Sequence, residues 1–410
     1  MAEKLNRRDF LKKASVASVA GGTGLLVGCS IGQPETQSAP APAEQAPAEE
    51  TTAGNGAATQ AEEAPEGAVK EVNVNKNQTM QWRVVTTWPP TLPILMDGVR
   101  MMADQIKTMS EGRLEIEVFG AGELVGALET FDAVNAGTAE MGHGASYYWA
   151  GKTAASQFFA SVPFGMNAQQ MYSWLFAGGG LELWQEAYKD FDLVPLPSGN
   201  TGVQMGGWFN REINSLDDFN GLKMRIPGLG GKTIAKVGGS AELIAGGEIY
   251  TSLERGVIDA TEWIGPYHDE ILGFNKVAQY YYYPGWHEPG SVLELLISRQ
   301  AWDGLSADLQ NIVLRASEAQ NSWMLARFDA ENNAALQRLV AAGTDLRPFP
   351  DDVMAGLRTA AEEVLQEVAD SDAMSKKVFE SFRAFQEDAA QWGNISERAY
   401  YNSIQREVES

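Results

Sequence analysis

The sequence predicts an α/β protein with two lobes and a helical C-terminal extension. From residue 80 onward, segments with the alternating hydrophobicity of strands take turns with segments of helical spacing, an order typical of sheets covered by helices. The folded part, residues 79–410, is longer than one compact domain usually is, so two lobes are the natural division. Residues 306–342 contain neither Pro nor Gly and predict one very long helix that braces the lobes.

Residues 1–28 have the pattern of an export leader. Arg7 and Arg8 lie in a run that resembles a twin-arginine export signal, and the apolar stretch after it is too short and Gly-rich to span a bilayer. The stretch ends in Leu26, Val27, Gly28 and Cys29, which resemble a bacterial lipobox. We therefore expect Cys29, the only cysteine, to be the lipidated first residue of a periplasmic or cell-surface lipoprotein. The alternative is a free cysteine after an ordinary signal peptide.

Residues 29–78 predict a disordered tether. They are rich in Ala, Pro, Glu, Gln, Thr and Gly, a composition that cannot bury enough apolar surface to offset the entropy of ordering. The tether would hold the folded part away from a membrane, which the protein contacts only through its lipid anchor. The formal net charge of −23 argues against nucleic acid and anionic lipid as partners.

The first lobe is expected to begin with a βαβαβ unit, which predicts a parallel sheet with helices on both faces. Apolar residues spaced by three and four positions mark the first helix, and Gly137 closes the second. The expected strands are 81–87, 113–119 and 139–145, and the expected helices are 95–106 and 127–136.

The second lobe is expected to begin with strands 193–197 and 203–209, followed by a turn and strand in 216–227 and by helices 232–237 and 248–257. In residues 259–269 a short β-prone start is ended by Gly265 and Pro266, which open a helix. Glu262 and Trp263 therefore lie at the carboxyl end of a strand, where open α/β sheets place their ligand crevices. Crossovers between two such lobes are typical of a hinged binding protein with a central cleft.

The C-terminal part is expected to be helical in 306–342, 351–370 and 375–409. The long helix outruns one small lobe, so part of its apolar stripe needs another surface. That surface is either the second lobe, which the helix then braces, or a second copy of the chain in a homodimer that the long helix and the C-terminal helices would build together. The stripe is expected at Ile312, Ala316, Ala319, Trp323, Ala326 and Ala330.

Three polar residues stand beside Gly or Trp in otherwise apolar segments: Gln204, Glu262 and Glu288. Taken singly, each is more often a solvated surface residue. If they converge, they form a site for a hard cation, because carboxylate and amide oxygens suit sodium, calcium or magnesium rather than zinc. The backbone carbonyl of Trp263 is a further candidate ligand. Calcium or sodium is favoured, because magnesium demands tighter octahedral geometry.

Arg225 lies between apolar neighbours in a predicted strand, and Arg is rarely buried without a partner. Its planar fork matches a carboxylate, so a substrate carboxylate is one candidate partner and a structural salt bridge is the other. Among the aromatic residues near predicted strand ends, Tyr147 is the candidate substrate contact, although most aromatic residues are core.

A search for a catalytic nucleophile finds none in the sequence. His143, His268 and His287 fall in no hydrolase or zinc-protease spacing, no Gly-x-Ser-x-Gly elbow is present, and the single cysteine belongs to the leader. We therefore do not expect an enzyme. His287 precedes Glu288 and is a candidate neighbour of the site.

Taken together, the leader and four motifs in order resemble the solute-binding subunits of TRAP transporters of the DctP type. The resemblance covers residue 80 to the C-terminus and is nearest to the branch that binds 2-oxo and 2-hydroxy monocarboxylates. The motifs are 200–208 with Gln204, 222–228 with Arg225, 259–266 with Glu262 and Trp263, and 285–290 with Glu288.

The resemblance implies a two-lobed periplasmic binding protein that captures a small monocarboxylate, such as pyruvate or lactate, and delivers it to TRAP permease subunits in the membrane. It implies a calcium or sodium ion that bridges the protein and the substrate, with Arg225 gripping the substrate carboxylate. The expected metal ligands are Gln204, Glu262, Trp263 and Glu288, and the expected substrate contacts are Gln204, Arg225, Tyr147 and Trp263.

Two other classes of function stay open at this stage. One is the ligand-binding partner of a sensory receptor, and the other is a secreted metal-dependent enzyme that acts on a carboxylate. The sequence does not decide which monocarboxylate binds, or between calcium and sodium.

Overall fold

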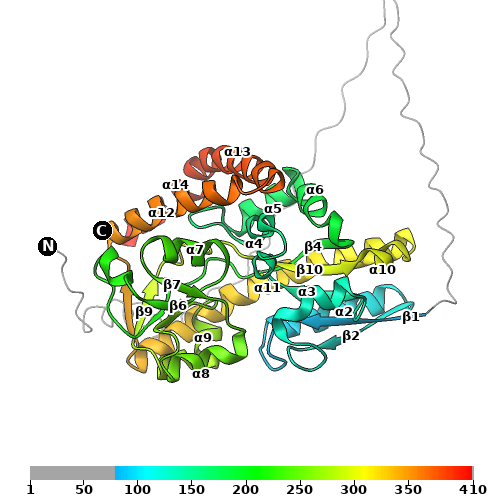
Figure 1. Cartoon of the computed structure of the whole chain (residues 1–410), viewed down its shortest axis with the longest axis horizontal. Coiled ribbons are helices and arrows are strands. Elements are labelled where there is room, and N and C mark those ends of the chain that lie inside the picture. Colours follow the sequence, from blue (N-terminus) through cyan, green and yellow to red (C-terminus); the bar gives the residue numbers. More distant parts are fainter. Residues whose placement is uncertain (1–78, 409–410) are drawn as a thin grey trace, which may run out of the picture. The chain divides into compact units, whose positions relative to one another are not determined.

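A computed structural model describes residues 79–408, with side chains to residue 404. The leader predicted at 1–28 and the tether predicted at 29–78 lie outside the described residues, so both stay predictions. The described part contains two β-sheets, each covered by helices, and each sheet forms the core of one lobe (Figure 1). The predicted α/β fold with two lobes is confirmed.

The first sheet is mixed and has the strand order β2-β1-β3-β10-β4. Strands β1, β2 and β3 are parallel, as predicted, whereas β10 runs antiparallel to both β3 and β4. The assignment of residues 193–197 to the second lobe was wrong, because β4 pairs with β10 at the edge of this sheet. Pro195 and Pro197 are compatible with that position, since an edge strand pairs on one side only. The strands are β1 Met80–Thr86, β2 Leu114–Phe119, β3 Met141–Gly144, β4 Leu193–Asn200 and β10 Val292–Ser298.

The second sheet has the strand order β11-β9-β5-β8-β6-β7 and is also mixed. Its central strand β8 is only two residues long, pairs antiparallel with β5 and parallel with β6, and ends directly before Glu262. Arg225, the last residue of β6, is paired in register with Thr261. The strands are β5 Gly207–Phe209, β6 Lys223–Arg225, β7 Ser240–Glu242, β8 Ala260–Thr261, β9 Tyr280–Tyr283 and β11 Asp345–Pro348.

The helices follow the predicted spacing in most places. Helix α2 buries Leu95, Val99, Met102 and Ile106 and carries Asp97 in its first turn, where a negative charge favours the helix dipole. The helices of the two lobes are α2 Leu95–Met109, α3 Thr130–Asn135, α4 Gln157–Ala160, α5 Ala168–Ala177, α6 Gly180–Ala187, α7 Gly228–Lys236, α8 Ile249–Glu254, α9 Pro266–Leu272 and α10 Arg299–Asp303.

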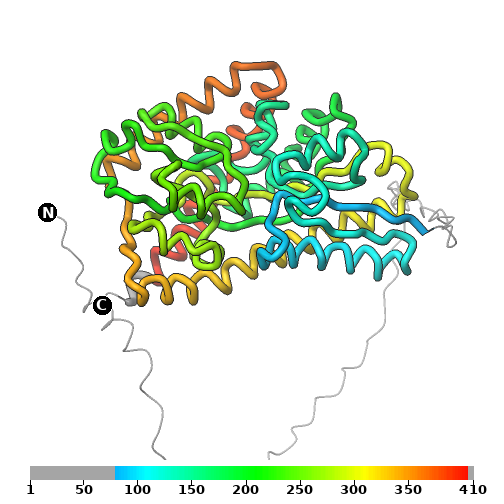
Figure 2. Tube along the Cα trace, turned by 60° about the horizontal axis from the view of Figure 1, so that its bottom comes forward, coloured from blue at the N-terminus to red at the C-terminus, as the bar shows by residue number. Residues whose placement is uncertain are grey.

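The long helix α11, Ala307–Ala341, packs against β4 and α2 of the first lobe and against α9 of the second, and so braces both (Figure 2). The predicted stripe was wrong in phase: Ala319, Ala326 and Ala330 are exposed. The buried face includes polar residues that a search for apolar spacing does not select. Among them, Gln320 Oε1 accepts a hydrogen bond from the Ser198 hydroxyl at 2.8 Å, and Asn321 Oδ1 accepts one from the backbone N–H of Gly199 at 3.1 Å.

Three neighbouring segments join the two sheets. Residues 201–206 connect β4 to β5, residues 284–291 connect β9 to β10, and α11 leads from the first lobe to β11. These segments form the hinge. Each sheet contains strands from separate parts of the chain. Each lobe is therefore built from several stretches of the sequence.

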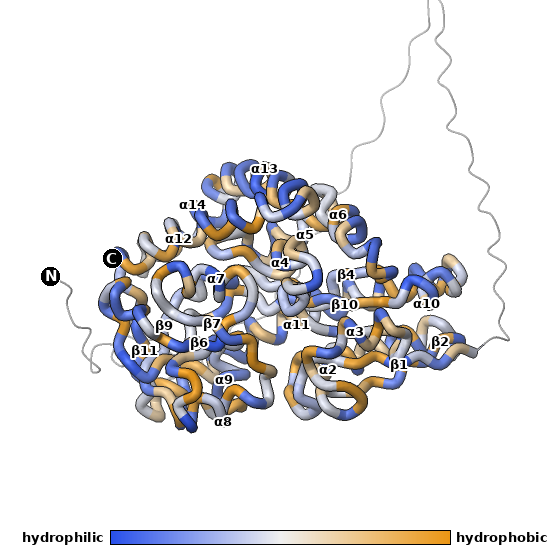
Figure 3. The backbone as a smooth tube through the Cα atoms, viewed as in Figure 1, coloured by the Kyte–Doolittle hydropathy of each residue, from blue (hydrophilic) through white to orange (hydrophobic). Residues whose placement is uncertain are grey.

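Three helices complete the chain: α12 Asp351–Ala369, α13 Ala373–Ile395 and α14 Glu397–Val408. Helix α12 packs on α7 of the second lobe and α13 on α4 to α6 of the first, so this pair also bridges the lobes, above α11 in Figure 1. Hydrophilic residues predominate along α13 in Figure 3. The predicted helix 375–409 is divided at Ser396. Within residues 79–408, none of the helices is both long enough and apolar enough to span a lipid bilayer.

Candidate cation and carboxylate site

The candidate site lies where two of the hinge segments, residues 201–206 and 284–291, meet the carboxyl end of β8. Backbone hydrogen bonds hold these segments together: Gln204 N–H donates to the Glu288 carbonyl at 3.1 Å, and Gly285 N–H donates to the Gln204 carbonyl at 3.0 Å. Met205 N–H donates to the Ile264 carbonyl at 3.0 Å, which ties the crossing segment to the loop of Glu262. The predicted site residues are therefore placed by main-chain contacts at a hinge.

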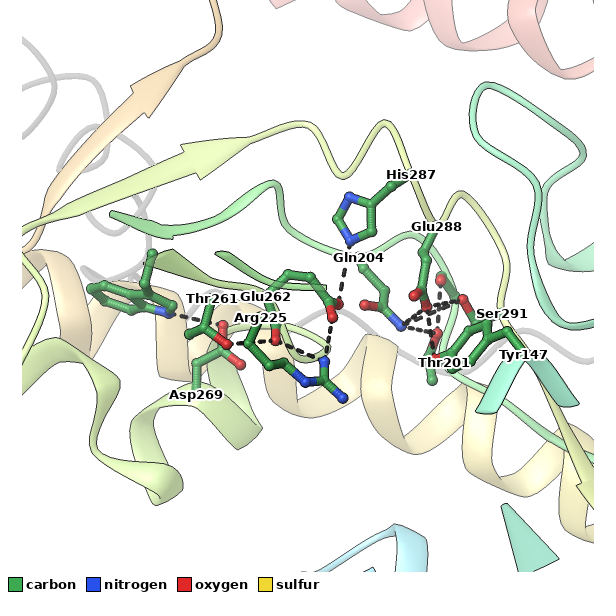
Figure 4. A network of polar contacts seen from close by, with 12 residues as sticks. Tyr147, Thr201, Gln204, Arg225, Thr261, Glu262, Asp269, His287, Glu288 and Ser291 are labelled. Atoms are coloured by element: carbon green, nitrogen blue, oxygen red, sulfur yellow. Dashed lines mark hydrogen bonds and ion pairs between the residues drawn. The ribbon is translucent and has the colours of Figure 1, made fainter. Parts of the chain in front are cut away.

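Two carboxylates and an imidazole form a buried cluster. Glu262, His287 and Glu288 each offer a ligand atom, and these atoms lie within 4.8 Å of one another. His287 Nε2 lies 3.3 Å from Glu262 Oε2. All three side chains are almost fully buried. In Figure 4 His287 points at Glu262, and Gln204 lies between the two carboxylates.

The carboxylate of Glu288 collects several donors on one oxygen. Its Oε2 accepts from Gln204 Nε2 at 2.7 Å, from the Ser291 hydroxyl and from the Tyr147 hydroxyl at 3.4 Å. Burial, and then the negative charge of Glu262, raise the pKa of Glu288 to about 7. The rise means that a second negative charge in this cluster is costly without a positive partner.

Arg225 is 2% exposed and is held from several sides. Its Nε donates to the Ile244 carbonyl at 3.2 Å, and NH1 donates to the Glu262 carbonyl at 3.1 Å and forms an ion pair with Glu262 Oε1. Its guanidinium carbon lies 5.1 Å from the centre of the Trp263 ring, a cation–π contact. Burial lowers the pKa of Arg225, but the Glu262 carboxylate together with Tyr148 and Tyr147 more than offsets this, and the net shift is upward. Arg225 therefore stays charged.

Two adjacent tyrosines of the first lobe contact the site. Tyr147 reaches Glu288, whereas Tyr148 places its hydroxyl 3.5 Å from Arg225 NH2. Burial raises the pKa of Tyr148 to about 12, so its hydroxyl keeps its proton. Gly228, at φ 57°, begins α7 against Tyr147, and a Cβ there would lie 2.9 Å from the Tyr147 Cβ. The glycine thus permits the second lobe to approach Tyr147 closely.

The oxygen atoms that the site offers as ligands fit a hard cation. Gln204 Oε1 is a buried acceptor that lacks a hydrogen-bond partner among the described residues, while its amide nitrogen is already engaged by Glu288 and Thr201. A buried amide oxygen without a donor is costly unless something positive meets it. An amide oxygen beside two carboxylates is the ligand chemistry of calcium or sodium.

All the predicted site residues lie in this one region: Gln204, Arg225, Glu262, Trp263, Glu288 and Tyr147. His287, expected as a neighbour, joins the cluster. Sequence reasoning missed Tyr148, Thr201 and Ser291. Tyr148 stands next to Tyr147, which is a usable clue, but the two hydroxyl residues carry no local pattern. The other histidines lie elsewhere: His143 accepts from the Trp88 indole at 2.8 Å, and His268 Nε2 lies 2.9 Å from the Pro93 carbonyl.

Two sheets joined at a hinge, with a polar site enclosed between the lobes, define a solute-binding protein. The profile of the DctP family, described as bacterial extracellular solute-binding protein, family 7, matches residues 84–372. The chain belongs to this family, whose members are solute-binding receptors. It is a solute-binding protein of the TRAP transporter type, and the comparisons support neither of the rival classes.

Relatives show the same assignment. A monocarboxylate 2-oxoacid-binding periplasmic protein of Nostoc sp. is 46% identical over 323 residues, which is 79% of this chain and 88% of the relative. A TRAP solute-binding protein of Pseudoalteromonas atlantica, solved with sodium and pyruvate, is 43% identical, with a TM-score of 0.78 over 80% of this chain and 99% of the relative. A TRAP transporter solute-binding protein of Bordetella bronchiseptica was solved as a dimer of mixed occupancy with copurified calcium and picolinate. It is 40% identical, with a TM-score of 0.80 over 81% of this chain and 99% of the relative.

Proposed function

We propose that the protein captures a small 2-oxo or 2-hydroxy monocarboxylate, such as pyruvate or lactate, through a bound calcium or sodium ion and Arg225. It then delivers this substrate unchanged to TRAP permease subunits in the membrane. The observation that carries the proposal is the buried Gln204 Oε1, which has no hydrogen-bond partner within residues 79–408 and lies beside the Glu262 and Glu288 carboxylates, with one guanidinium next to them. The relatives that hold pyruvate or picolinate together with a cation support it.

Charge explains why an anion receptor needs a cation here. Glu262 and Glu288 together with a substrate carboxylate are three acidic groups, and Arg225 supplies one positive charge. Like charges a few ångströms apart repel by several kcal/mol even at an effective dielectric constant near 20. A cation held by Gln204, Glu262, Glu288 and the Trp263 carbonyl would neutralise the carboxylates and offer the substrate a direct ligand bond.

The substrate contacts follow from the same arrangement. Arg225 would grip the substrate carboxylate, Gln204 and Trp263 would contact the substrate as well as the cation, and Tyr147 would close the site from the first lobe. One guanidinium suits one carboxylate, which favours a monocarboxylate over a dicarboxylate.

Calorimetry on the mature chain tests this proposal. Pyruvate, lactate, 2-oxobutyrate and a branched 2-oxo acid would be titrated after exhaustive chelation and sodium removal, and again with calcium or sodium added back. We expect at least one acid to bind with the cation present and to bind much more weakly without it. Succinate serves as the dicarboxylate control. Full affinity in the metal-free protein would exclude the bridging role of the cation. The absence of binding by any monocarboxylate under either condition would exclude the proposed substrate class.

We also propose the predicted homodimer, in which α11 and the C-terminal helices form the contact, and the exposed apolar side chains of α13 and α14 support the C-terminal part of this contact. Helix α14 has twelve residues, and its described side chains are all exposed. A free helix of this length is marginal in water, so it gains stability by covering its apolar side chains. Trp392 is 68% and Ile395 72% exposed at the end of α13, and Tyr400, Tyr401 and Ile404 on α14 are exposed as well. The dimeric Bordetella relative supports a second copy of the chain as the covering surface.

Export and anchoring complete the proposal. A twin-arginine leader at 1–28 would carry the protein out of the cytoplasm, and lipidation of Cys29 would anchor it through the tether at 29–78. The Nostoc relative is described as periplasmic, which agrees with this location.

A further inference from the structure

We propose that Glu262 is a switch that makes substrate binding depend on the cation: Glu262 engages Arg225 until the cation draws its carboxylate away and frees the guanidinium for the substrate. This inference rests on the proposed function and concerns the order of binding at the same site. It goes beyond a bridging ion, because it assigns the two glutamates different roles.

The hydrogen-bond inventory of Arg225 carries the argument. A guanidinium has five N–H groups. The Nε hydrogen goes to the Ile244 carbonyl, and the two NH1 contacts go to the carbonyl and the Oε1 of Glu262. NH2 has one contact, with the Tyr148 hydroxyl. A carboxylate held by two parallel hydrogen bonds would accept one from NH1 and one from NH2. Glu262 Oε1 already accepts the one from NH1.

Glu262 and a substrate carboxylate therefore compete for the same NH1 hydrogen. The competition favours Glu262, because its carboxylate is tied to the chain next to β8 and needs no association from solution. The ion pair is also nearly inaccessible to water, at 2% and 1% exposure of the two side chains. A substrate that meets this pair must displace a charge-assisted hydrogen bond before both NH1 and NH2 can hold its carboxylate.

The alternative position for the Glu262 carboxylate is provided by the same cluster. Its other oxygen already lies 3.3 Å from His287 Nε2, and its ligand atom is within 4.8 Å of those of His287 and Glu288. A cation between these groups and the partnerless Gln204 Oε1 would give Glu262 a stronger partner than Arg225. Glu262 then releases NH1, and the guanidinium keeps its two carbonyl contacts and its orientation.

Glu288 offers a matched comparison. It is a carboxylate of the same length, it is equally buried, and it belongs to the same cluster, but its bonding partners are Gln204, Tyr147 and Ser291 rather than Arg225. Removing the negative charge of Glu288 would lower the repulsion of an anion without freeing any N–H of Arg225. The two glutamates therefore separate the switch from a plain charge effect.

The test compares Glu262→Gln with Glu288→Gln by calorimetric titration of pyruvate in chelator, with sodium removed. An amide at position 262 still accepts a hydrogen bond from the charged guanidinium, but it lacks the negative charge of the carboxylate and therefore holds NH1 more weakly than the ion pair does. We expect both variants to bind pyruvate more tightly than the chelated wild-type protein does, because each loses one negative charge, and Glu262→Gln to bind it about tenfold more tightly than Glu288→Gln does, because only Glu262→Gln weakens the hold on NH1. With calcium added, both variants should bind more weakly than the wild type. Adding Arg225→Met to Glu262→Gln should abolish the cation-independent binding.

Equal gains in the two variants would overturn the switch and leave charge repulsion as the cause of cation dependence. No gain in Glu262→Gln, in a variant whose far-ultraviolet circular dichroism and unfolding midpoint show a folded protein, would also overturn it. These outcomes differ from a failure of the proposed function, in which the wild-type protein binds no monocarboxylate even with calcium or sodium.

Rapid mixing of the unaltered wild-type protein gives a second measurement that needs no variant. Protein mixed first with calcium and then with pyruvate should bind at a rate proportional to the pyruvate concentration. When the protein is mixed first with pyruvate and then with calcium, the rate of pyruvate binding should be limited by calcium binding and should not depend on the pyruvate concentration. A pyruvate complex that forms to full extent before calcium arrives would contradict the compulsory order.

Discussion

Replacing Arg225 by Met should destabilise the folded protein far more than removing a surface charge does. The substitution keeps an unbranched apolar side chain of similar reach, but among the described residues it leaves the Glu262 carboxylate, which is 1% exposed, with His287 as its one remaining side-chain partner. It also removes the donors to the Ile244 and Glu262 carbonyls. The variant therefore measures how strongly the site depends on a positive charge at this position.

The expected loss in the free energy of unfolding follows from the burial of the ion pair between Arg225 and Glu262. Breaking a buried ion pair by removing one partner costs about 3–5 kcal/mol, because an uncompensated charge stays in the interior. The matched control is Lys377→Met, which removes an ion pair between Lys377 and Glu186 with an N–O distance of 2.6 Å. Those side chains are 54% and 49% exposed, so this control should cost about 0–1 kcal/mol.

Urea unfolding of the wild type and both variants, with and without calcium, is the assay. Calcium should restore part of the stability that Arg225→Met loses, because a cation beside Glu262 supplies the missing positive charge. In the same variant, pyruvate affinity at saturating calcium should fall by about ten- to a hundred-fold. If Arg225→Met unfolds within about 1 kcal/mol of the wild type with an unchanged m-value, the buried ion pair does not stabilise the site and the reasoning is refuted.

Other predictions concern parts of the molecule away from Arg225. Burial raises the pKa of Glu294 to about 8 from an ordinary value of 4.5, so the folded protein keeps a proton that the unfolded chain releases. Stability should therefore fall between pH 4.5 and 8, by on the order of 1 kcal/mol per pH unit. Glu294→Gln, which can still accept the Trp149 indole N–H, should flatten this dependence in urea unfolding at pH 6 and 8; an unchanged slope would assign it to other groups. Cys29→Ser should move the protein from the membrane fraction to the soluble exported fraction, and full membrane retention would exclude the lipid anchor. Trp392→Glu with Ile395→Glu should shift the sedimentation coefficient from dimer to monomer, whereas a wild-type monomer at micromolar concentration would exclude the dimer.

Much of the site was predictable from local chemistry. Gln204, Glu262 and Glu288 each stand beside Gly or Trp in an apolar segment, and Arg225 stands between apolar residues in a strand. Burying such groups is costly without partners, so their positions point to one another. Tyr148 was not selected, because two adjacent tyrosines look equivalent until the backbone turns one toward Glu288 and the other toward Arg225.

The sequence by itself predicted the first βαβαβ unit and the helices α11 and α12 close to their observed bounds, because periodicity and the positions of Gly and Pro act over a few residues, but it predicted none of α4, α5 and α6. It also determined which positions of α2 are buried. Only the tertiary structure decided that β4 and β10 belong to the first sheet, since strand pairing joins residues that are about a hundred positions apart. It alone decided that α11 turns Gln320 and Asn321 inward, because their partners lie on β4. Local pattern records that a residue is buried, whereas the identity of its partner depends on long-range packing.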